Sequence, residues 1–357
     1  MLKTPVSGSP KNNRIKKNNS IKWLAIAVVI CFAFSIGGAV VYGFASLAKP
    51  VTAIPGEAVI ITVRPGMTAT DIAQKLHENG LIRNYAVFRL ASKIGKLDSS
   101  LKAGEYSLHT GMSVNEIIAI ISEGRVTYYQ FTIPEGYTVN QIANLLEEKN
   151  FANAERFREL AKTFAPYPYM VNDNPLLIYK AEGFLFPDTY RVAAGVSEEQ
   201  LLAMMTNQFD RIFTPDMRQK ANELGLSWHD VFTLASIVER EAMLAEERPI
   251  IAAVFLNRLR IGMPLQSCAT IQYILGNPKA VLTIADTRIP SPYNTYQNMG
   301  LPPGPIANPG RASIAAVLQN EQTDNLFFVA DSKGRHHFGR TYQEHLRNIS
   351  RVESGSI

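Results

Sequence analysis

Two glutamates near the end of a predicted helix, Glu239 and Glu241, carry the chemistry that stands out in this chain. The helix is predicted over 228–245, directly after Ser227, a residue type that caps helix N-termini well. Apolar residues at spacings of four, three and four form one stripe of this helix, with Glu239 at one edge and Glu241 at the other. A carboxyl beside apolar surface has its charged form disfavoured, which is the condition that a general acid requires. On this pattern alone, a solvated flank is the commoner role for either side chain.

A second group of candidates lies in loops rich in glycine and proline. Four polar residues there can hydrogen-bond the hydroxyl or acetamido groups of a sugar: Gln266, Asn294, Tyr296 and Asn308. Because the same residue types also stabilise turns, a structural role is an equal alternative for each of them. Glu182 is a further candidate, and it precedes the aromatic pair Phe184 and Phe186, which a hydrophobic core would equally explain. The loop over 286–311 is long for a compact domain, and such loops are usually functional.

Neither a metal, a cofactor nor a nucleic acid is predicted as a partner. His336 and His337 are adjacent, and on a strand they would point to opposite faces, so they make a poor chelating pair. The sequence has no phosphate loop, no dinucleotide fingerprint and no Cys/His metal spacing. The net charge of +5 arises near the start, where residues 1–22 hold six of the 36 Lys and Arg and no acid. The remainder, 30 bases against 31 acids, has no field that would attract nucleic acid.

An uncharged apolar run follows the basic tail. As a helix, residues 23–44 would span roughly 33 Å, enough for a hydrocarbon core of about 30 Å. Basic residues flank only the N-terminal side of this run, which predicts a cytoplasmic N-terminus with everything after the run outside. A cleaved signal peptide is the alternative, but the run is too long and no clear cleavage site follows it. The sequence therefore predicts a single-pass protein of the cytoplasmic membrane.

The rest of the chain divides into small strand–helix units and a mainly helical region. Segments 63–81 and 133–151 form a weak internal repeat of strand, proline–glycine turn, threonine and helix, and the turn of the second has one inserted residue. The units loosely resemble LysM modules, which bind N-acetylglucosamine polymers, and a β/α spacer is an equal alternative. The predicted class is α+β, with one transmembrane helix. The predicted boundaries are a tail at 1–22, a transmembrane helix at 23–44, a linker at 45–58, a LysM-like module at 59–127, a second repeat or connector at 128–175, a mainly helical domain with some strands at 176–350 and a tail at 351–357.

Six motifs that follow one another in order give a more specific signal than any single residue. They are EGFLFPDTY at 182–190, ASIVE at 235–239, VFLNRL at 254–259, MPLQS at 263–267, YNTY leading to GLPPGPIANPG at 293–310, and LFFVAD at 326–331. With these motifs the chain resembles the YceG-like family of endolytic murein transglycosylases, and the resemblance covers the whole chain. It implies that the domain at 176–350 is catalytic and that no cofactor is needed.

The resemblance implies a role for Glu239. The family's catalytic glutamate falls on this residue, which would protonate the glycosidic oxygen between N-acetylmuramic acid and N-acetylglucosamine. The carboxylate would then take the proton of the muramic C6 hydroxyl, closing a 1,6-anhydro ring. Many members have Asp-Pro where this chain has Cys268-Ala269, a departure that favours one essential acid over two.

Peptidoglycan glycan strands are the implied substrate, and the family suggests action on newly made strands near the membrane, beside the peptidoglycan synthesis machinery. Two alternatives remain open. One is a non-catalytic scaffold that binds peptidoglycan and links the membrane to the wall. The other is a muramidase-type hydrolase, which needs a second carboxyl to activate water or to form a covalent intermediate.

Overall fold

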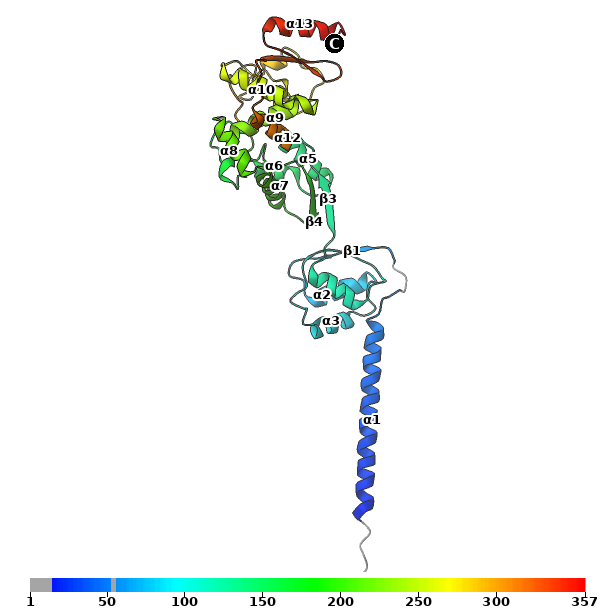
Figure 1. The fold of residues 1–357 in the computed structure, drawn as a ribbon. Helices are drawn as coiled ribbons and strands as arrows, with labels where there is room; N and C mark the ends of the chain where they lie inside the picture. Colours follow the sequence, from blue (N-terminus) through cyan, green and yellow to red (C-terminus); the bar gives the residue numbers. More distant parts are fainter. Residues whose placement is uncertain (1–14, 53–55, 357) are drawn as a thin grey trace, which may run out of the picture. The chain divides into compact units, whose positions relative to one another are not determined.

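The computed structural model describes residues 15–52 and 56–356, which form two compact units, one ending at Thr127 and the other beginning at Tyr128 (Figure 1). The predicted basic tail lies outside the described residues up to position 14, and so do residues 53–55 of the predicted linker and the last residue of the predicted tail at 351–357.

Helix α1, Ile15–Leu47, begins the described chain. Its segment Lys22–Leu47 is the one helix among the described residues that is long and apolar enough to cross a membrane, by length and composition. Large apolar side chains on it are exposed, among them Trp23 and Phe34. An exposed apolar helix of this length is compatible with a single-pass anchor, and its direction across a membrane stays a prediction from the charge pattern.

The first unit continues in the order strand, helix, helix, strand, helix. These elements are β1 (Val59–Val63), α2 (Ala69–Glu78), α3 (Tyr85–Ile94), β2 (Gly104–Leu108) and α4 (Val114–Glu123). β1 and β2 pair antiparallel, with Val59 opposite Leu108. Thr68 and Ser113 open α2 and α4 with capping boxes, which satisfy the first free N–H groups of each helix. The strands and helices share one apolar core, and the LysM-like assignment of this module stays a prediction.

The second unit opens with the same order of elements. They are β3 (Tyr128–Thr132), α5 (Val139–Glu148), α6 (Ala154–Thr163), β4 (Thr189–Ala193) and α7 (Glu198–Ile212), with the short helix η1 (Pro168–Met170) before β4. β3 and β4 pair antiparallel, with Tyr128 opposite Ala193. Thr138 and Ser197 again form capping boxes. The two units thus share an order of elements that extends well past the predicted repeat. The sheet of the second unit pairs β3 with β4, which lie on opposite sides of the predicted boundary at 175.

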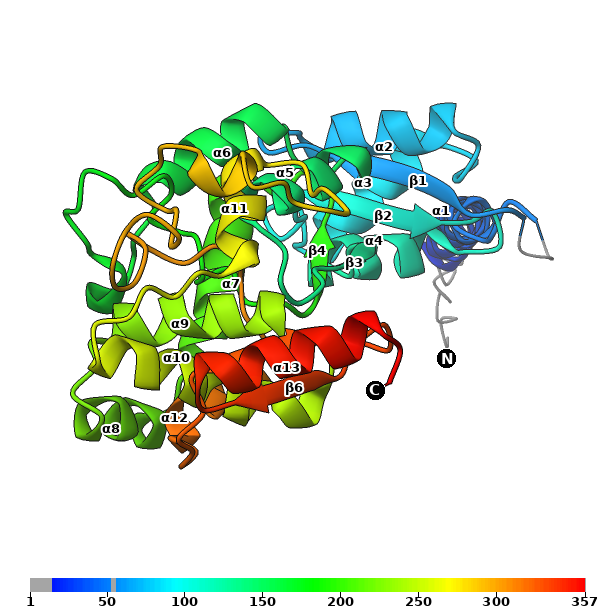
Figure 2. The same ribbon diagram turned by 90° about the horizontal axis from the view of Figure 1, so that it is seen from above.

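The rest of the second unit is mainly helical. It comprises α8 (Pro215–Glu223), α9 (Trp228–Glu241), η2 (Ala245–Glu247), α10 (Arg248–Arg260), α11 (Cys268–Leu275), η3 (Asp286–Arg288), α12 (Arg311–Gln319), β5 (Phe327–Ala330), β6 (His336–Gly339) and α13 (Tyr342–Glu353). Helix α9 packs against α10, α11 and α12, and its residues 231–238 are all buried. Figure 2 shows α9 beside α10, and α13 lying on the β5–β6 hairpin.

The observed mixture of helices and strands agrees with the predicted α+β class. Helix α9 ends at Glu241 and not at the predicted position 245, because Ala242 has an extended backbone (φ −72°, ψ 114°). Several short elements are absent from the sequence-based prediction: α6, β4, α11, α12 and the β5–β6 hairpin. Short elements owe most of their stability to tertiary packing, so local patterns identify them poorly.

Candidate active site

Helix α9 holds Glu239 in its last turn, at the edge of the hydrophobic core. A capping box between Ser227 and Asp230 opens the helix. Val231 and Val238 are fully buried on the stripe expected from the sequence. Because packing fixes this face of α9, Glu239, the residue after Val238, is held in place. Its side chain is only 6% exposed.

The two carboxyl oxygens of Glu239 have different surroundings. Oε2 accepts hydrogen bonds from the backbone N–H of Gly310 at 3.0 Å and from the Ser313 hydroxyl at 2.7 Å. Oε1 has only a long contact with the Arg248 guanidinium, at 3.5 Å. The carboxyl is therefore oriented through Oε2, and Oε1 is the oxygen with the weaker contact to the protein.

The start of α12 depends on this contact. Its N-cap is Gly310, which has no side chain to accept hydrogen bonds from the free N–H groups of the first turn. The Glu239 carboxyl accepts the Gly310 N–H instead. The positive end of the α12 dipole thus faces the Glu239 carboxyl, an arrangement that favours an anion at this point.

Arg248 is the cation nearest to this carboxyl, and it begins α10. Its side chain is 15% exposed. Its Nε is buried without a hydrogen-bond partner among the described residues, a state that costs free energy unless a ligand or water supplies an acceptor. Arg248 therefore has a donor to spare beside Glu239.

Glu241, the competing acid on the same helix, serves a different element. Its Oε1 accepts hydrogen bonds from the Ser267 hydroxyl and, at 3.3 Å, from the Ala269 N–H. Both donors lie at the start of α11, which Ser267 leaves without a cap of its own. Glu241 is thus bound as the N-terminal cap of α11.

Tyr296 contacts the first residue of α11. Its hydroxyl is 3.1 Å from the Sγ of Cys268, the position where the sequence departs from the family pattern. Burial, and then the contact with Cys268, raise the pKa of Tyr296. The phenol therefore stays neutral and available as a hydrogen-bond donor.

Glu182 and Asn308 lie in the interior, 2% and 0% exposed. Glu182 accepts the Val139 N–H at 3.0 Å and contacts the Tyr273 hydroxyl at 3.2 Å. The Asn308 amide donates to Glu182 at 3.1 Å and to the Tyr137 carbonyl at 2.9 Å. The two residues join the loop before α12 to the start of α5, so the structure gives them positioning contacts.

Glu182 makes the stability of this unit depend on pH. Burial raises the pKa of Glu182 from 4.5 to about 8. Between these values the folded chain keeps a proton that the unfolded chain releases, so the free energy of unfolding should fall as pH rises from 4.5 to about 8 and level off above. We expect Glu182→Gln, which cannot titrate, to lack this fall, as measured by urea unfolding across the window. Glu148→Gln, on the exposed face of α5, should keep it, and an unchanged fall in Glu182→Gln would refute the assignment.

Asn294 and Gln266 differ in their access to solvent. Asn294 is 0% exposed, and its side chain bonds the carbonyls of Thr287 and Ile289. Gln266 is exposed, and its φ of +50° is a conformation that non-glycine residues rarely adopt. Its N–H donates to the Thr295 carbonyl at 3.0 Å, which holds this conformation. Of these two, Gln266 is the one whose side chain a ligand can reach.

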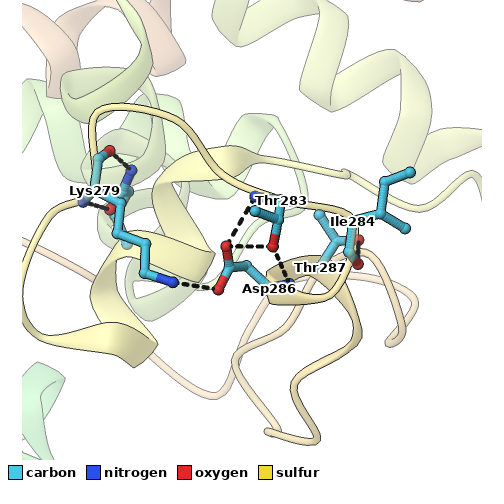
Figure 3. Close-up of polar contacts among 6 residues, drawn as sticks. Lys279, Thr283, Ile284, Asp286 and Thr287 are labelled. Atoms are coloured by element: carbon cyan, nitrogen blue, oxygen red, sulfur yellow. Dashed lines mark hydrogen bonds and ion pairs between the residues drawn. The ribbon is translucent and has the colours of Figure 1, made fainter.

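The segment between α11 and the loop that holds Asn294 is fixed by polar contacts among its own residues (Figure 3). Lys279 Nζ lies 2.6 Å from Asp286 Oδ1, and Asp286 Oδ2 accepts both the N–H and the hydroxyl of Thr283. The Lys279 contact and then the Thr283 bonds lower the pKa of Asp286 to about 2. The Asp286 carboxylate is therefore ionised and holds η3, which leads into the loop with Asn294 and Tyr296.

A small cavity of about 180 Å³ adjoins the end of α9. Arg240, Thr138, Gln141 and Gln272 are among the residues that line it. A larger cavity of about 510 Å³ lies between α10 and the segment after α12, and none of its lining residues is a candidate from the sequence. None of the candidate residues lines the smaller cavity either, and Arg240, the residue after Glu239, is its link to the end of α9.

The two adjacent histidines have separate partners. His336 Nδ1 lies 2.7 Å from Glu247 Oε2, and His337 Nε2 lies 3.1 Å from Asp331 Oδ2. In the part of the chain that the structure describes, no group of three or more His, Cys, Asp or Glu side chains is placed to hold a metal ion. The paired histidines hold the β5–β6 hairpin in place.

The structure also brings to Glu239 two residues that the sequence analysis does not single out, Arg248 and Glu135. Glu135 lies in the turn between β3 and α5, and its carboxyl contacts Gly310. One signal was available in the sequence. Glu135 separates Pro134 from Gly136 in the second repeat, whereas Pro65 and Gly66 are adjacent in the first.

A glutamate bound at the N-terminus of a second helix, with an arginine beside it, defines the centre of this site. The family model for the YceG-like family matches residues 61–351, and the chain belongs to this family. A crystal structure of a yceG-like protein from Listeria monocytogenes is similar, with a TM-score of 0.58 and 33% sequence identity, covering 82% of this chain and 99% of that one.

Relatives from Bacillus subtilis and Streptococcus pneumoniae carry the name endolytic murein transglycosylase. The one from Bacillus subtilis is 36% identical over 325 residues, which cover 87% of this chain and 89% of that protein. The one from Streptococcus pneumoniae serotype 2 is 32% identical over 329 residues, 84% of this chain. The match spans 59% of the length of the pneumococcal protein.

Proposed function

We propose that this protein is a lytic transglycosylase that cleaves peptidoglycan glycan strands internally, with Glu239 as its catalytic acid and base. Membership of the YceG-like family and the names of the relatives support this activity and substrate. The observation that carries the residue assignment is the asymmetry of the Glu239 carboxyl, whose Oε2 is held by Gly310 and Ser313 while Oε1 has only the distant Arg248.

The proposed chemistry needs one proton and no water. Glu239 gives its proton to the glycosidic oxygen, the bond from the muramic C1 to this oxygen breaks, and its electron pair stays with the leaving N-acetylglucosamine. The sugar passes through an oxocarbenium-like state. The C6 hydroxyl oxygen then bonds to C1 while its proton returns to Glu239. The product ends in 1,6-anhydro-N-acetylmuramic acid, and the enzyme regains its starting protonation state.

The contacts of Glu239 suit both halves of this cycle. The Gly310 N–H and the α12 dipole stabilise the carboxylate that forms after the first proton transfer. Gln266 and Tyr296 are proposed to contact the glycan, since each has a polar group beside the start of α11. Glu182, Asn294 and Asn308 are proposed to position these loops from the interior.

The proposed location is the outer face of the cytoplasmic membrane. The apolar segment Lys22–Leu47 supports a single-pass anchor, and the basic residues before it support a cytoplasmic N-terminus. The catalytic unit would then act on glycan strands close to the membrane, where new strands are made. A partnership with the synthesis machinery would follow from this position.

A muramidase-type hydrolase is the second candidate, favoured by one observation. Glu135 gives the site a second carboxyl close to Glu239, and hydrolysis of a glycosidic bond ordinarily uses two carboxyls. In a lytic transglycosylase the C6 hydroxyl replaces water as the nucleophile, so the Glu135 carboxyl is not needed to activate water.

Mass spectrometry of cleaved glycan distinguishes these activities. The full-length protein in detergent is incubated with uncross-linked glycan strands. We expect fragments that end in anhydro sugars, each lighter by one water than a reducing end, and far fewer of them from Glu239→Gln. Reducing ends would establish hydrolysis instead, and strands that stay intact would support binding without catalysis.

A further inference from the structure

The turn between β3 and α5 differs from its counterpart in the first unit by one residue. In the first unit Pro65-Gly66 precedes Thr68, the cap of α2, and in the second Pro134-Glu135-Gly136 precedes Thr138, the cap of α5. Both helices begin with a capping box and are ten residues long. The helix start is complete without an acid in the first unit, so Glu135 is not required to build it.

This turn is held against the end of α9. The Gly136 N–H donates to the Asn308 carbonyl at 2.9 Å, and the Gly136 carbonyl accepts from Arg240 at 3.4 Å. A Cβ at Gly136 would lie 3.5 Å from the Cγ of Glu239, and the φ of +74° at this position favours glycine. The backbone of the turn therefore fixes the base of the Glu135 side chain next to Glu239.

The carboxyls of Glu135 and Glu239 meet at Gly310. A Cβ at position 310 would lie 2.0 Å from Oε1 of Glu135, so the carboxyl occupies the space that a side chain would fill. The N–H of the same residue donates to Glu239. Gly310 has an ordinary φ of −73°, so it is the close approach of Glu135, not the backbone conformation, that calls for glycine here.

Glu135 has no hydrogen-bond donor of its own among the described residues, and the residue is exposed. Desolvation raises the pKa of Glu135, the charge of Glu239 raises it further, and the charge of Arg248 opposes the rise. Two neighbouring carboxyls with a single cation beside them do not readily both ionise.

Other charged groups nearby are committed elsewhere or exposed. On α9, Arg240 contacts the Gly136 carbonyl, and before α10, Glu247 is bonded to His336. On α12, Arg311 is the ionisable residue, and it is exposed. The electrostatic partners of Glu135 are therefore Glu239 and Arg248.

We propose that Glu135 is a positioning residue of the active site, which through its carboxyl keeps one proton on the pair that it forms with Glu239. The coupling of the two carboxyls does not depend on the proposed function, whereas its effect on glycan cleavage does. Glu135 forms no bond to the sugar. The pair keeps one proton available for the glycosidic oxygen over a wider pH range, because ionising the second carboxyl beside the first is unfavourable.

The pH profile of cleavage tests this proposal. The alkaline limb, where activity falls as the pair loses its last proton, should move to lower pH by about one unit in Glu135→Gln, since the repelling charge is gone. Activity below that limb should be largely kept. Gly310→Ala should move the limb in the same direction, because its methyl group displaces the flexible end of Glu135 while the backbone N–H to Glu239 remains. Glu148→Gln, which removes an exposed carboxyl from α5, should leave the limb in place.

A loss of activity at all pH values with an unmoved limb, in both Glu135→Gln and Gly310→Ala, would overturn the proposal and leave Glu135 a merely structural residue. Carbon-13 NMR of labelled glutamate carboxyls in the full-length protein gives a readout without turnover. If the higher of the pair's two titration steps disappeared in Glu135→Gln, the pair would be supported even if the protein cut no glycan, in which case the proposed function alone would fail. Two carboxyls that titrate independently of each other would refute the pair even in an active enzyme.

Discussion

Glu239→Gln is expected to lower the rate of glycan cleavage by about 100- to 10,000-fold, the range typical of losing a general acid–base residue. The amide has nearly the same shape and can still accept the Gly310 N–H through its oxygen, so α12 keeps its start. It cannot supply the proton that the leaving sugar needs. Cleavage is measured as the release of anhydro ends, and folding is checked by thermal unfolding.

Glu241→Gln is the matched control, two residues along the same helix. Its carboxyl caps α11, so the substitution should weaken the α11 start by about 1 kcal/mol and leave acid catalysis in place. If Glu241→Gln abolished cleavage and Glu239→Gln did not, the roles of the two glutamates would have to be exchanged.

Asn308→Ala is expected to have the largest effect on stability, a loss of about 3 kcal/mol. The buried Asn308 side chain accepts the Leu185 N–H at 2.8 Å and donates to Tyr137 and Glu182. Removing it leaves the buried Leu185 N–H without its acceptor and takes one hydrogen bond each from the Tyr137 carbonyl and from Glu182. The measurement is the free energy of unfolding in urea.

Asn298→Ala provides the comparison for this loss. Asn298 lies in the same loop and also bonds two backbone carbonyls, those of Ser291 and Asn294, but it is exposed, so water replaces the lost bonds. A loss below about 1 kcal/mol is expected for it. Equal losses of unfolding free energy in the two variants would show that burial does not make the Asn308 hydrogen bonds more stabilising than those of Asn298.

Features that depend on near neighbours in the chain could be predicted from the sequence. The apolar run before Leu47 predicted a helix able to cross a membrane. The buried stripe of α9 follows its 3.6-residue period, and capping residues such as Ser227 locate helix starts. The family resemblance came from six ordered motifs, and the family match bears it out.

The same local patterns could not separate polar residues that hold a loop from those that face a ligand. Asn294 and Asn308 share glycine- and proline-rich surroundings with Gln266 and Tyr296, and Glu182 is a candidate only by its place before an aromatic motif. The structure puts Glu182, Asn294 and Asn308 in the interior, with their hydrogen-bonding groups used within the fold. Burial is a property of the packed chain, and a turn pattern carries little information about it.

The sequence by itself determined that a carboxyl lies beside an apolar stripe at the end of α9, since helix periodicity is local. Only the tertiary structure decided that Glu239 contacts the start of α12 and that Glu241 contacts the start of α11. Gly310 is 71 residues from Glu239, and Ser267 is 26 residues from Glu241. Contacts over such separations depend on how the helices pack, which also brings Glu135 and Arg248 to the same point.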